Sequence, residues 1–582
     1  MSDNTDFASA EKITRRFLPN DLDVNNWSAL EPFFSSLVNR KNNSIEELLQ
    51  WLYDLSELEA AIEEHAGWLY IRMTCDTQNK EFTEAYTFFV EEINPKIAPY
   101  NDLLNKKFIN ETSLKSLDGR YENHIKSVQN SIRLFREENI PLQAQLSVKE
   151  QQYGEIAGAL SVEVNGKTLT LQQAANFLKD PDRKLRDEVY HKIVSRREVE
   201  RERLDLLFNE LISIRTTVAK NAGFENYRDF KFVELDRFDY TADDCMNFHS
   251  SVKKCIVPVL DDFMQERKSL LKTPTLKPWD LEVDPEGKAD LKPFQKGTEL
   301  LEKSINCFTE IDPYFGMVLN TLKTKGYTDL DSRIGKAPGG YNYPLYESGV
   351  PFIFMNATGS LRDVITMVHE GGHAIHSMLN ADLDFIAFKE VPSEIAELAS
   401  MGMELISMEH WHHFFTNEDD LKRAKREQLE NVIEALPWIA CVDAFQHWLY
   451  TNPSHTITER TATWKKLILD FSSSHVDWSE DQNALEIMWQ KQLHLFEVPF
   501  YYIEYGMAQL GAIAVWRNYK MNPQLAIEQY KNALKLGYTQ SIPTVYEAAG
   551  IRFDFSEKYI KELVDFVRIE LKNCKILTVF FV

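Results

Sequence analysis

The residues whose types and spacing most clearly indicate catalysis lie in one short segment, 369–373, which reads HEGGH. In a helix of 3.6 residues per turn, His369 and His373 lie one turn apart on the same face. Both imidazoles can then reach a single zinc ion, at about 2.0–2.1 Å from each nitrogen. Glu370 lies about 100° further around the helix, where its carboxylate can act as general base toward a zinc-activated water. This spacing predicts a catalytic zinc site.

The residues around the motif favour a helix that carries such a site. Ser360 and Asp363 are three residues apart and match a capping box, so the helix is predicted to begin close to Leu361. Gly371 and Gly372 then fall in the helix interior, where each costs roughly 0.8–1 kcal/mol relative to alanine. That cost is expected where a bound peptide or another backbone must come close.

A third ligand must come from outside this helix, because a catalytic zinc ion has three protein ligands and an open fourth position. The next candidates are Glu390, Glu394 and Glu397, spaced four and three residues apart. They would share one face of a second helix, whose first turn tolerates Pro392. Spacing alone does not choose between them. Of two carboxylates one turn apart, one can bind the metal while the other hydrogen-bonds a ligand histidine and orients it.

Five stretches of the chain resemble the oligoendopeptidase F and thimet oligopeptidase family of zinc metallopeptidases, and the oligoendopeptidase F branch is the more similar. The matching region runs from about residue 180 to 517, and the stretches are GKAPGGY at 335–341, PFIFMN at 351–356, HEGGH at 369–373, EVPS at 390–393 and the segment 494–505. The resemblance implies that Glu390 is the third zinc ligand. Glu394 is then expected to hydrogen-bond a ligand and orient it without binding the metal itself. His376 lies two turns from His369 on the same face, and we expect it to play a similar supporting role.

The groups that stabilise the transition state are expected in the segment 494–505, where the family has a histidine and tyrosines facing zinc and substrate. Imidazole and phenol groups can donate hydrogen bonds to the oxyanion that forms during peptide hydrolysis. We choose His494, Tyr502 and Tyr505, while Tyr501 and Tyr505 would share a helical face almost as well. A stripe of aromatic core residues is the competing interpretation for each tyrosine.

Helices dominate the predicted organisation. Apolar residues recur at helical spacing from 44 to about 128, and Asn165-Gly166 predicts a β-hairpin near 162–171. Asp180-Pro181 then predicts the start of a long helical stretch that runs toward Gly223.

We therefore expect an N-terminal helical lobe at 1–179 and a catalytic metallopeptidase domain at 180–582. The expected fold class is mainly α, and the resemblance implies a two-lobed helical zincin-type metallopeptidase with a small β-sheet beside the active-site helix and a deep substrate channel. The apolar run 350–355 is either a core strand or, as the resemblance implies, a sheet edge to which an extended peptide adds.

Charge and composition narrow the choice of partners. Among 582 residues the formal net charge is −24, which disfavours attraction to nucleic acid or anionic lipid. The six cysteines form no CxxC pair, so reduced and mostly buried thiols are predicted. The polar N-terminus lacks the features of a secretory signal, and no stretch reaches the roughly 18 apolar residues of a membrane-spanning helix. We expect a cytoplasmic protein without nucleic-acid or membrane partners.

The motif and the resemblance together predict a zinc-dependent oligoendopeptidase that hydrolyses internal bonds of short peptides. It would hold one zinc ion per chain and use Glu370 as general base. A zinc carboxypeptidase or dipeptidase on a similar helical scaffold is an alternative, which would need a cationic group to hold a substrate terminus. A peptide-binding protein with structural zinc is another, but it would need four protein ligands and would have no use for Glu370.

Overall fold

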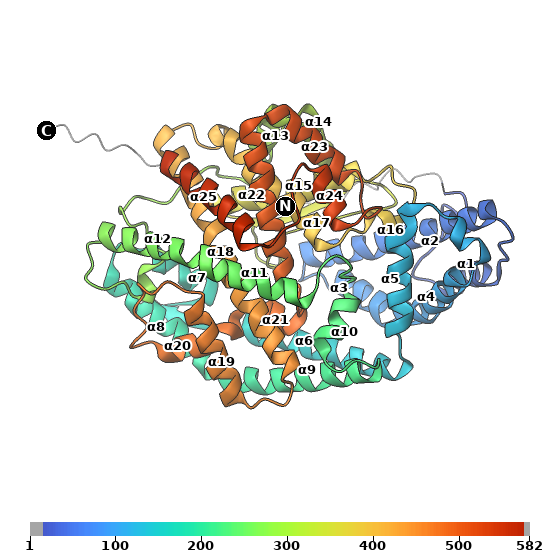
Figure 1. Ribbon diagram of the computed structural model, residues 1–582, viewed down its shortest axis with the longest axis horizontal. Coiled ribbons are helices and arrows are strands. Elements are labelled where there is room, and N and C mark those ends of the chain that lie inside the picture. The colour runs from blue at the N-terminus through green and yellow to red at the C-terminus, as the bar shows by residue number, and fades with distance from the viewer. Residues whose placement is uncertain (1–14, 575–582) are drawn as a thin grey trace.

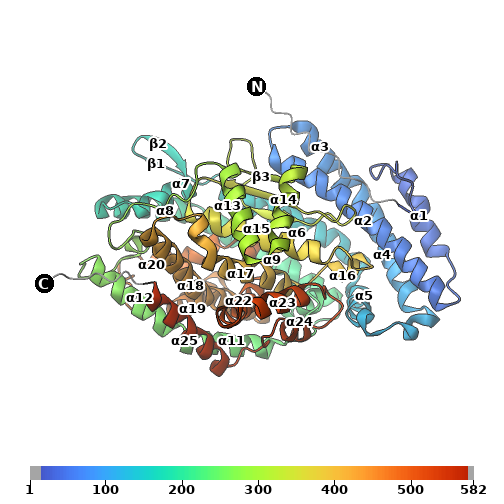
Figure 2. The same ribbon diagram turned by 90° about the horizontal axis from the view of Figure 1, so that it is seen from above.

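The computed structural model describes residues 15–574, and helices make up most of this part of the chain (Figure 1, Figure 2). The expected mainly α fold class is confirmed. Within the described range five short strands occur, two in a hairpin and three in a small sheet. Residues 1–14 and 575–582 lie outside the described residues, so the expectation drawn from the N-terminal segment stays a prediction.

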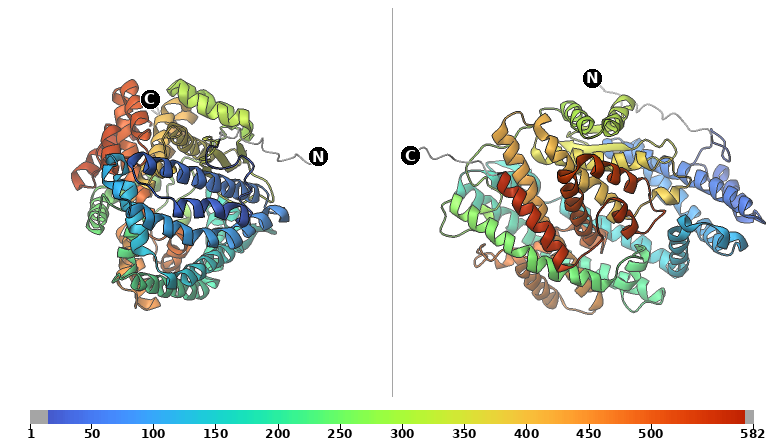
Figure 3. Two further views of the ribbon diagram at one scale, coloured as in Figure 1. Left: turned by 90° about the vertical axis from the view of Figure 1, so that its right-hand side faces the viewer. Right: turned by 45° about the horizontal axis from the view of Figure 1, so that its top comes forward.

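The N-terminal helices pack around a hydrophobic core of their own. Helix α2 begins after Ser44, whose side chain accepts a hydrogen bond from the backbone N–H of Glu47. Its Trp51 and Leu58 are fully buried in this first core. Figure 3 shows these helices gathered at one end of the molecule. Their bounds are α1 (Trp27–Asn39), α2 (Ile45–Cys75), α3 (Lys80–Phe88), α4 (Asn94–Ile109) and α5 (Glu122–Leu134).

This first core also takes residues from far along the chain. Phe385 and Phe388, at the short helix α16 (Ile386–Lys389), are buried in it. Phe388 packs edge-on against Tyr121, with ring centroids 5.1 Å apart. The N-terminal helices are therefore joined by apolar packing to the segment that follows the HEGGH helix.

The predicted β-hairpin is present between α6 (Ile140–Gly158) and α7 (Leu171–Ala175). Strands β1 (Ser161–Val164) and β2 (Lys167–Thr170) pair in antiparallel fashion. Asn165 and Gly166 have φ angles of 52° and 73°. Both angles lie in the left-handed region that a type I′ turn requires, so the hairpin prediction is confirmed.

The long helical stretch before Gly223 consists of two helices, α8 (Arg183–Val199) and α9 (Arg201–Asn221). The first begins later than predicted, because the side chain of Asp182 rather than Asp180 accepts the N-cap hydrogen bond. Gly223 has a φ of 85° and ends the stretch, as expected. The lobe boundary between residues 179 and 180 stays a prediction.

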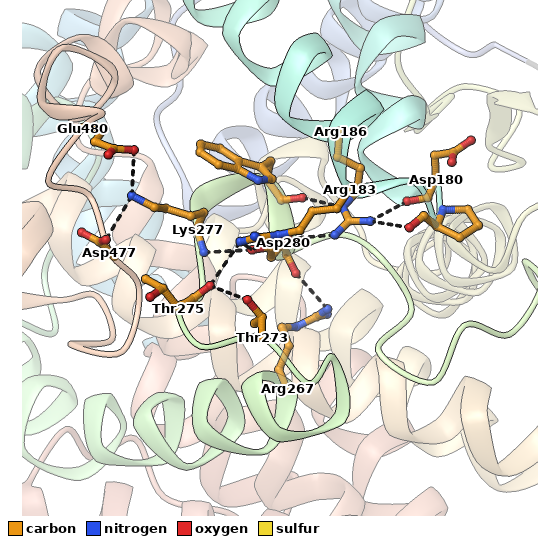
Figure 4. Close-up of polar contacts among 12 residues, drawn as sticks. Asp180, Arg183, Arg186, Arg267, Thr273, Thr275, Lys277, Asp280, Asp477 and Glu480 are labelled. Atoms are coloured by element: carbon orange, nitrogen blue, oxygen red, sulfur yellow. Dashed lines mark hydrogen bonds and ion pairs between the residues drawn. The ribbon is translucent and has the colours of Figure 1, made fainter.

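One buried carboxylate, Asp280, holds the connection that follows α12 (Val257–Leu270) against α8 (Figure 4). Asp280 accepts hydrogen bonds from Arg183 at 2.7 Å and from Arg186 at 2.8 Å. Burial alone would raise the pKa of Asp280, but hydrogen bonds from these guanidinium groups and from the backbone of Lys277 lower it. The connection is therefore a fixed part of the fold rather than a loose linker.

The small sheet has the strand order β3–β5–β4. Strand β5 (Phe352–Ala357) lies in the middle, parallel to β3 (Thr328–Asp331) and antiparallel to β4 (Tyr341–Tyr343). The expectation that the run 350–355 forms a sheet edge is therefore wrong, because both sides of β5 are already paired. Its core-strand interpretation is correct, and β4 is one of the two edge strands.

Most of the remaining described chain surrounds one large core, while the β-hairpin, α7 and α8 enclose a small third core. The HEGGH segment lies in α15 (Leu361–Leu379), which packs on α17 (Ser393–Ser407), and α17 packs on α22 (Tyr502–Met521). From residue 15 to 574, no helix is both long enough and apolar enough to cross a bilayer. The remaining helices are α10 (Tyr227–Glu234), α11 (Ala242–Cys255), α13 (Gly297–Ile311), α14 (Pro313–Lys325), α18 (Glu418–Thr451), α19 (Ile457–Asp470), α20 (Gln482–Ile487), α21 (Leu493–Glu497), α23 (Pro523–Leu534), α24 (Ile542–Ala548) and α25 (Glu557–Asn573).

Candidate metal centre

The two histidines lie where the predicted helix puts them. Ser360 and Asp363 form a reciprocal capping box, and α15 begins at Leu361 as expected. His369 and His373 project from one face of this helix, with ring centroids 4.9 Å apart. One rigid element thus supplies two imidazole donors.

A carboxylate from the neighbouring helix completes a set of three donors. Glu397 of α17 has Oε2 3.3 Å from His369 Nε2 and 3.8 Å from His373 Nε2. One donor atom from each of these residues lies within 4.8 Å of the other two. Two imidazole nitrogens and one carboxylate oxygen form a ligand set of catalytic zinc sites, with the fourth position left open. The residues present therefore fit a zinc ion.

Glu390, which the resemblance implied as the third ligand, does not join this set. Helix α17 begins at Ser393, after Pro392, so Glu390 precedes the helix instead of sharing a face with Glu397. Glu390 ends α16 and lies near Glu63 of α2. Desolvation by the surrounding protein, together with the charge of Glu63, raises the pKa of Glu390 to about 7, although the side chain still reaches solvent. The structure thus replaces Glu390 by Glu397 in the candidate ligand set.

Gly372 explains how α17 comes close enough to supply a ligand. A Cβ at this position would lie 2.7 Å from Ser400 Cα and 2.8 Å from the Ala399 carbonyl oxygen, both backbone atoms of α17. Glu397 precedes Ser400 by about one helical turn, so the close crossing carries its carboxylate toward the histidines. At Gly371, a Cβ would lie 2.8 Å from the ring of Phe308. Of the two predicted reasons for these glycines, close approach of another backbone is the one observed at Gly372.

A second carboxylate on α17 orients His369. Glu404 Oε1 lies 2.7 Å from His369 Nδ1, and its Oε2 accepts a hydrogen bond of 2.7 Å from Gln428 of α18. This contact leaves Nε2 of His369 to face Glu397. Sequence reasoning missed Glu404, although seven residues, almost two whole turns, put it on the same face of α17 as Glu397. That spacing is the signal that could have found it.

Glu394 and His376, the two residues expected to support the ligands, have other partners. Glu394 is buried and accepts a hydrogen bond of 2.5 Å from the Tyr240 hydroxyl. It belongs to a charged cluster with Arg237 and Glu504. His376 is buried and hydrogen-bonds the backbone of Leu534. The supporting role expected of Glu394 belongs to Glu404 in this geometry.

The two histidines keep the carboxylate of Glu397 ionised. Burial alone would raise the pKa of Glu397, but its hydrogen bond to His369 and the charges of both histidines lower it to about 2. Ser400 adds a hydrogen bond of 3.0 Å to Glu397 Oε2. An ionised carboxylate beside two imidazoles is ready to bind a divalent cation.

Glu370 lies buried next to this set. Burial raises its pKa to about 7, while the charge of His369 and a backbone hydrogen bond from Asn342 act in the opposite direction. Asn342 belongs to β4, so the carboxylate lies between α15 and an edge strand of the sheet. A carboxyl group that titrates near neutral pH is suited both to accept and to return a proton.

A chain of hydrogen bonds fixes the orientation of His494. Trp438 Nε1 donates to Gln492 Oε1 at 3.0 Å, which leaves the amide nitrogen of Gln492 to donate to His494 Nδ1 at 2.7 Å. His494 Nδ1 is then an acceptor, so its proton is on Nε2. Burial lowers the pKa of His494 to about 4, which keeps the ring neutral at pH 7. His494 is therefore a neutral N–H donor.

The tyrosines at the start of α22, with Tyr501 as its N-cap, surround His494, but only some of them approach the metal-binding donors. The ring centroids of Tyr501, Tyr502 and Tyr505 lie 6.1, 4.8 and 5.9 Å from that of His494. The Tyr501 hydroxyl donates to Glu397 Oε1 at 3.4 Å and also contacts the Tyr505 hydroxyl. The Tyr502 hydroxyl interacts instead with Trp438 and Gln492. Tyr501, which had been the alternative choice, is thus nearer to the donor set.

Comparison with known protein families shows that the chain matches families of peptidases. The model of Peptidase family M3 matches residues 176–565, and the model of the Peptidase M3 N-terminal domain matches residues 17–135. An oligoendopeptidase F homolog from Borreliella burgdorferi is 23% identical over 515 residues, which cover 84% of this chain and 84% of that protein. Oligopeptidase PepF from Bacillus subtilis is 20% identical over 297 residues, covering 51% of this chain and 44% of the relative.

Solved structures share the fold over nearly the whole chain. PZ peptidase A with an inhibitor is 23% identical and superposes with a TM-score of 0.88, covering 96% of this chain and 99% of that one. Oligoendopeptidase F from Enterococcus faecium is 16% identical with a TM-score of 0.61, covering 94% of this chain and 97% of the other. At these identities the likeness establishes the fold.

Proposed function

Because the chain belongs to peptidase family M3, we propose that it hydrolyses internal bonds of short peptides with a zinc ion held by His369, His373 and Glu397. The observation that carries this proposal is the convergence of three donors from two helices beside the buried carboxylate of Glu370. Glu397 takes the place that the resemblance gave to Glu390.

A bound zinc ion would supply Lewis-acid chemistry, polarising the scissile carbonyl and making water more acidic. Glu370 takes a proton from the attacking water and returns it to the leaving amine. Its pKa near 7 favours both transfers at neutral pH. Glu404 fixes the ring of His369 through Nδ1, so that Nε2 keeps facing the other donors.

The negative oxygen of the tetrahedral intermediate needs hydrogen-bond donors. We assign this role to Nε2–H of His494 and to the hydroxyls of Tyr501 and Tyr505. Gln492 holds His494 in the required tautomer. The Tyr501 hydroxyl already lies beside Glu397, which supports its inclusion. Tyr502 supports the ring of His494 rather than touching the substrate.

The position of β4 favours cleavage within a peptide over removal of a terminal residue. Strand β4 is an edge of the sheet, and its Asn342 contacts Glu370. An extended peptide that pairs with this edge would run past Glu370 in both directions. A carboxypeptidase or dipeptidase would instead stop the peptide with a charged group that holds its terminus.

The deciding experiment uses a quenched peptide of about ten residues, blocked at both ends. Wild type should cleave it internally, and a zinc chelator should abolish the cleavage. Glu370→Gln keeps the size of the side chain but cannot accept the proton, so zinc should stay bound while the rate falls by at least roughly 10²–10⁴-fold. Full activity of zinc-loaded Glu370→Gln would refute this mechanism and favour another active site. A blocked peptide left intact by active enzyme would favour the exopeptidase alternatives.

The ligand assignment has its own test. Glu397→Ala should lose zinc during dialysis, because it removes one of three protein ligands. Glu390→Ala is the matched control, since it removes a glutamate that lies outside the donor set, and it should keep its zinc. The reverse result, measured as zinc per chain, would return the third ligand to Glu390.

A further inference from the structure

A second group of potential metal ligands lies where helices α11 and α18 pack together. Cys245 and His249 are one turn apart on α11, and Asp443 and His447 are one turn apart on α18. One donor atom each from Cys245, Asp443 and His447 lies within 4.8 Å of the other two. His249 Nε2 lies 2.7 Å from Asp443 Oδ2, and His447 Nε2 lies 3.2 Å from the same oxygen.

All four side chains are buried, and several of their polar atoms lack partners. Cys245 and Asp443 are 0% exposed, His447 is 3% exposed and His249 is 6% exposed. Asp443 Oδ1, His249 Nδ1 and His447 Nδ1 have no hydrogen-bond partner within residues 15–574, and His447 Nε2 has only its 3.2 Å contact with Asp443. A buried polar atom without a partner destabilises the fold. A purely hydrogen-bonded network does not account for so many in one place.

We propose that Cys245, His249, Asp443 and His447 form a second metal site that holds a structural zinc ion. Thiolate, imidazole and carboxylate are all zinc ligands, and a structural site is closed by four protein donors. An ionised Cys245 and Asp443 carry two negative charges, which cancel the charge of the ion when the histidines are neutral. A neutral cluster costs less to bury than a charged one.

Three of the donors, from Cys245, Asp443 and His447, are spaced to suit one ion, and His249 is the fourth, in contact with the group through Asp443. Tetrahedral coordination at the usual zinc distances separates neighbouring donors by about 3.3–3.6 Å. The Asp443 oxygen is 2.7 and 3.2 Å from the two imidazole nitrogens, so these donors need to part by about half an ångström. Each pair is anchored on its own helix, and a closed site also requires the His249 ring to rotate toward the Cys245 and His447 donors.

The surroundings of this second site favour a structural ion over a catalytic one. The rings of Phe232 and Phe500 pack against His447, with centroids 5.8 and 5.3 Å away. Burial raises the pKa of the Cys245 thiol, against the charge of Arg237, but a bound zinc ion would ionise the thiol outright. The ion would tie α11 to α18 in a place that no substrate reaches.

Zinc content separates this site from the catalytic centre. Full-length protein purified without chelators should contain two zinc ions per chain. His373→Ala removes a ligand of the catalytic centre only and should retain at least one. One zinc per chain in the wild type and none in His373→Ala would overturn the second site. The measurement does not depend on peptidase activity.

Cobalt substitution tests the thiolate ligand directly. Metal-free full-length protein reloaded with Co²⁺ should show a sulfur-to-cobalt charge-transfer band in the near ultraviolet, which the His369, His373 and Glu397 set cannot give. Cys245→Ser should lose this band. Cys441→Ser should keep the band, because Cys441 is a fully buried cysteine that lies on α18 and outside the donor group. Absence of the band in cobalt-loaded wild type, or its survival in Cys245→Ser, would overturn the proposal, and the wild-type spectrum needs no folded variant.

Discussion

Replacing Gly372 by alanine should damage the metal centre far more than it damages the fold. The added Cβ would lie 2.7 Å from Ser400 Cα, where ordinary contact begins at 3.4 Å. Helix α17 would have to retreat by about 0.7 Å, since a backbone atom cannot rotate aside. Glu397, one turn from Ser400, would move away from the histidines with it.

The expected effects on stability and on activity differ in size. Overpacking lowers the free energy of unfolding by about 1–3 kcal/mol. The higher helix propensity of alanine offsets roughly 0.8–1 kcal/mol of this loss, so Gly372→Ala should destabilise the fold by about 2 kcal/mol at most. A misplacement approaching 1 Å costs roughly 10²-fold in rate. We therefore expect kcat/KM to fall by about that factor, together with weaker zinc retention.

Gly154→Ala is the matched control for this change. Gly154 lies in the interior of α6, and a Cβ there would meet nothing within 4 Å. It should stabilise the protein by roughly 0.5–1 kcal/mol and leave activity unchanged. Urea unfolding, zinc content and peptide cleavage would be measured for both variants. If Gly372→Ala behaved like Gly154→Ala in all three, the close crossing of α15 and α17 would not be what positions Glu397.

Three further changes probe other parts of the molecule. Glu404→Ala removes the carboxylate that orients His369 and should weaken zinc affinity by roughly 10–100-fold in a chelator competition; unchanged affinity would contradict that role. Gln492→Glu should move the proton of His494 to Nδ1, so that Nε2 no longer donates, and lower kcat roughly 10²–10³-fold with a smaller effect on KM; a change confined to KM would contradict it. Burial lowers the pKa of His124 to about 4, below its value of about 6.5 in the unfolded chain, so the unfolded state binds the proton first and stability is lost as pH falls through this window. His124→Phe should remove up to about 3 kcal/mol of that loss in urea unfolding followed from pH 7 to 4, and an unchanged pH dependence would refute this.

Local signals in the sequence predicted local structure well. The capping box at Ser360 correctly predicted the start of α15, and Asn165 and Gly166 correctly predicted the type I′ turn. Each depends on hydrogen bonds or dihedral angles of residues close together in the chain, so each can be derived from a short segment. The same holds for the two histidines one turn apart on α15.

The parts of the site that join separate elements could not be derived in this way. Choosing Glu397 required knowing that α17 begins after Pro392 and which of its faces meets α15. The central position of β5 depended on its pairing with strands from two other segments. Cys245 and Asp443 are nearly 200 residues apart, and only the packing of α11 on α18 makes them neighbours.

The core of the N-terminal helices cannot be completed during synthesis until Phe385 and Phe388 have been translated. The core formed by residues 18–128 includes these two side chains. Ribosomes add about 5–20 residues per second, so the roughly 260 residues that separate Val128 from Phe385 take roughly 13–50 s to appear. Folding of a small helical unit is faster than this by orders of magnitude. The emerging N-terminal helices should therefore spend most of this interval with an incomplete apolar surface, which is the kind of surface that chaperones bind.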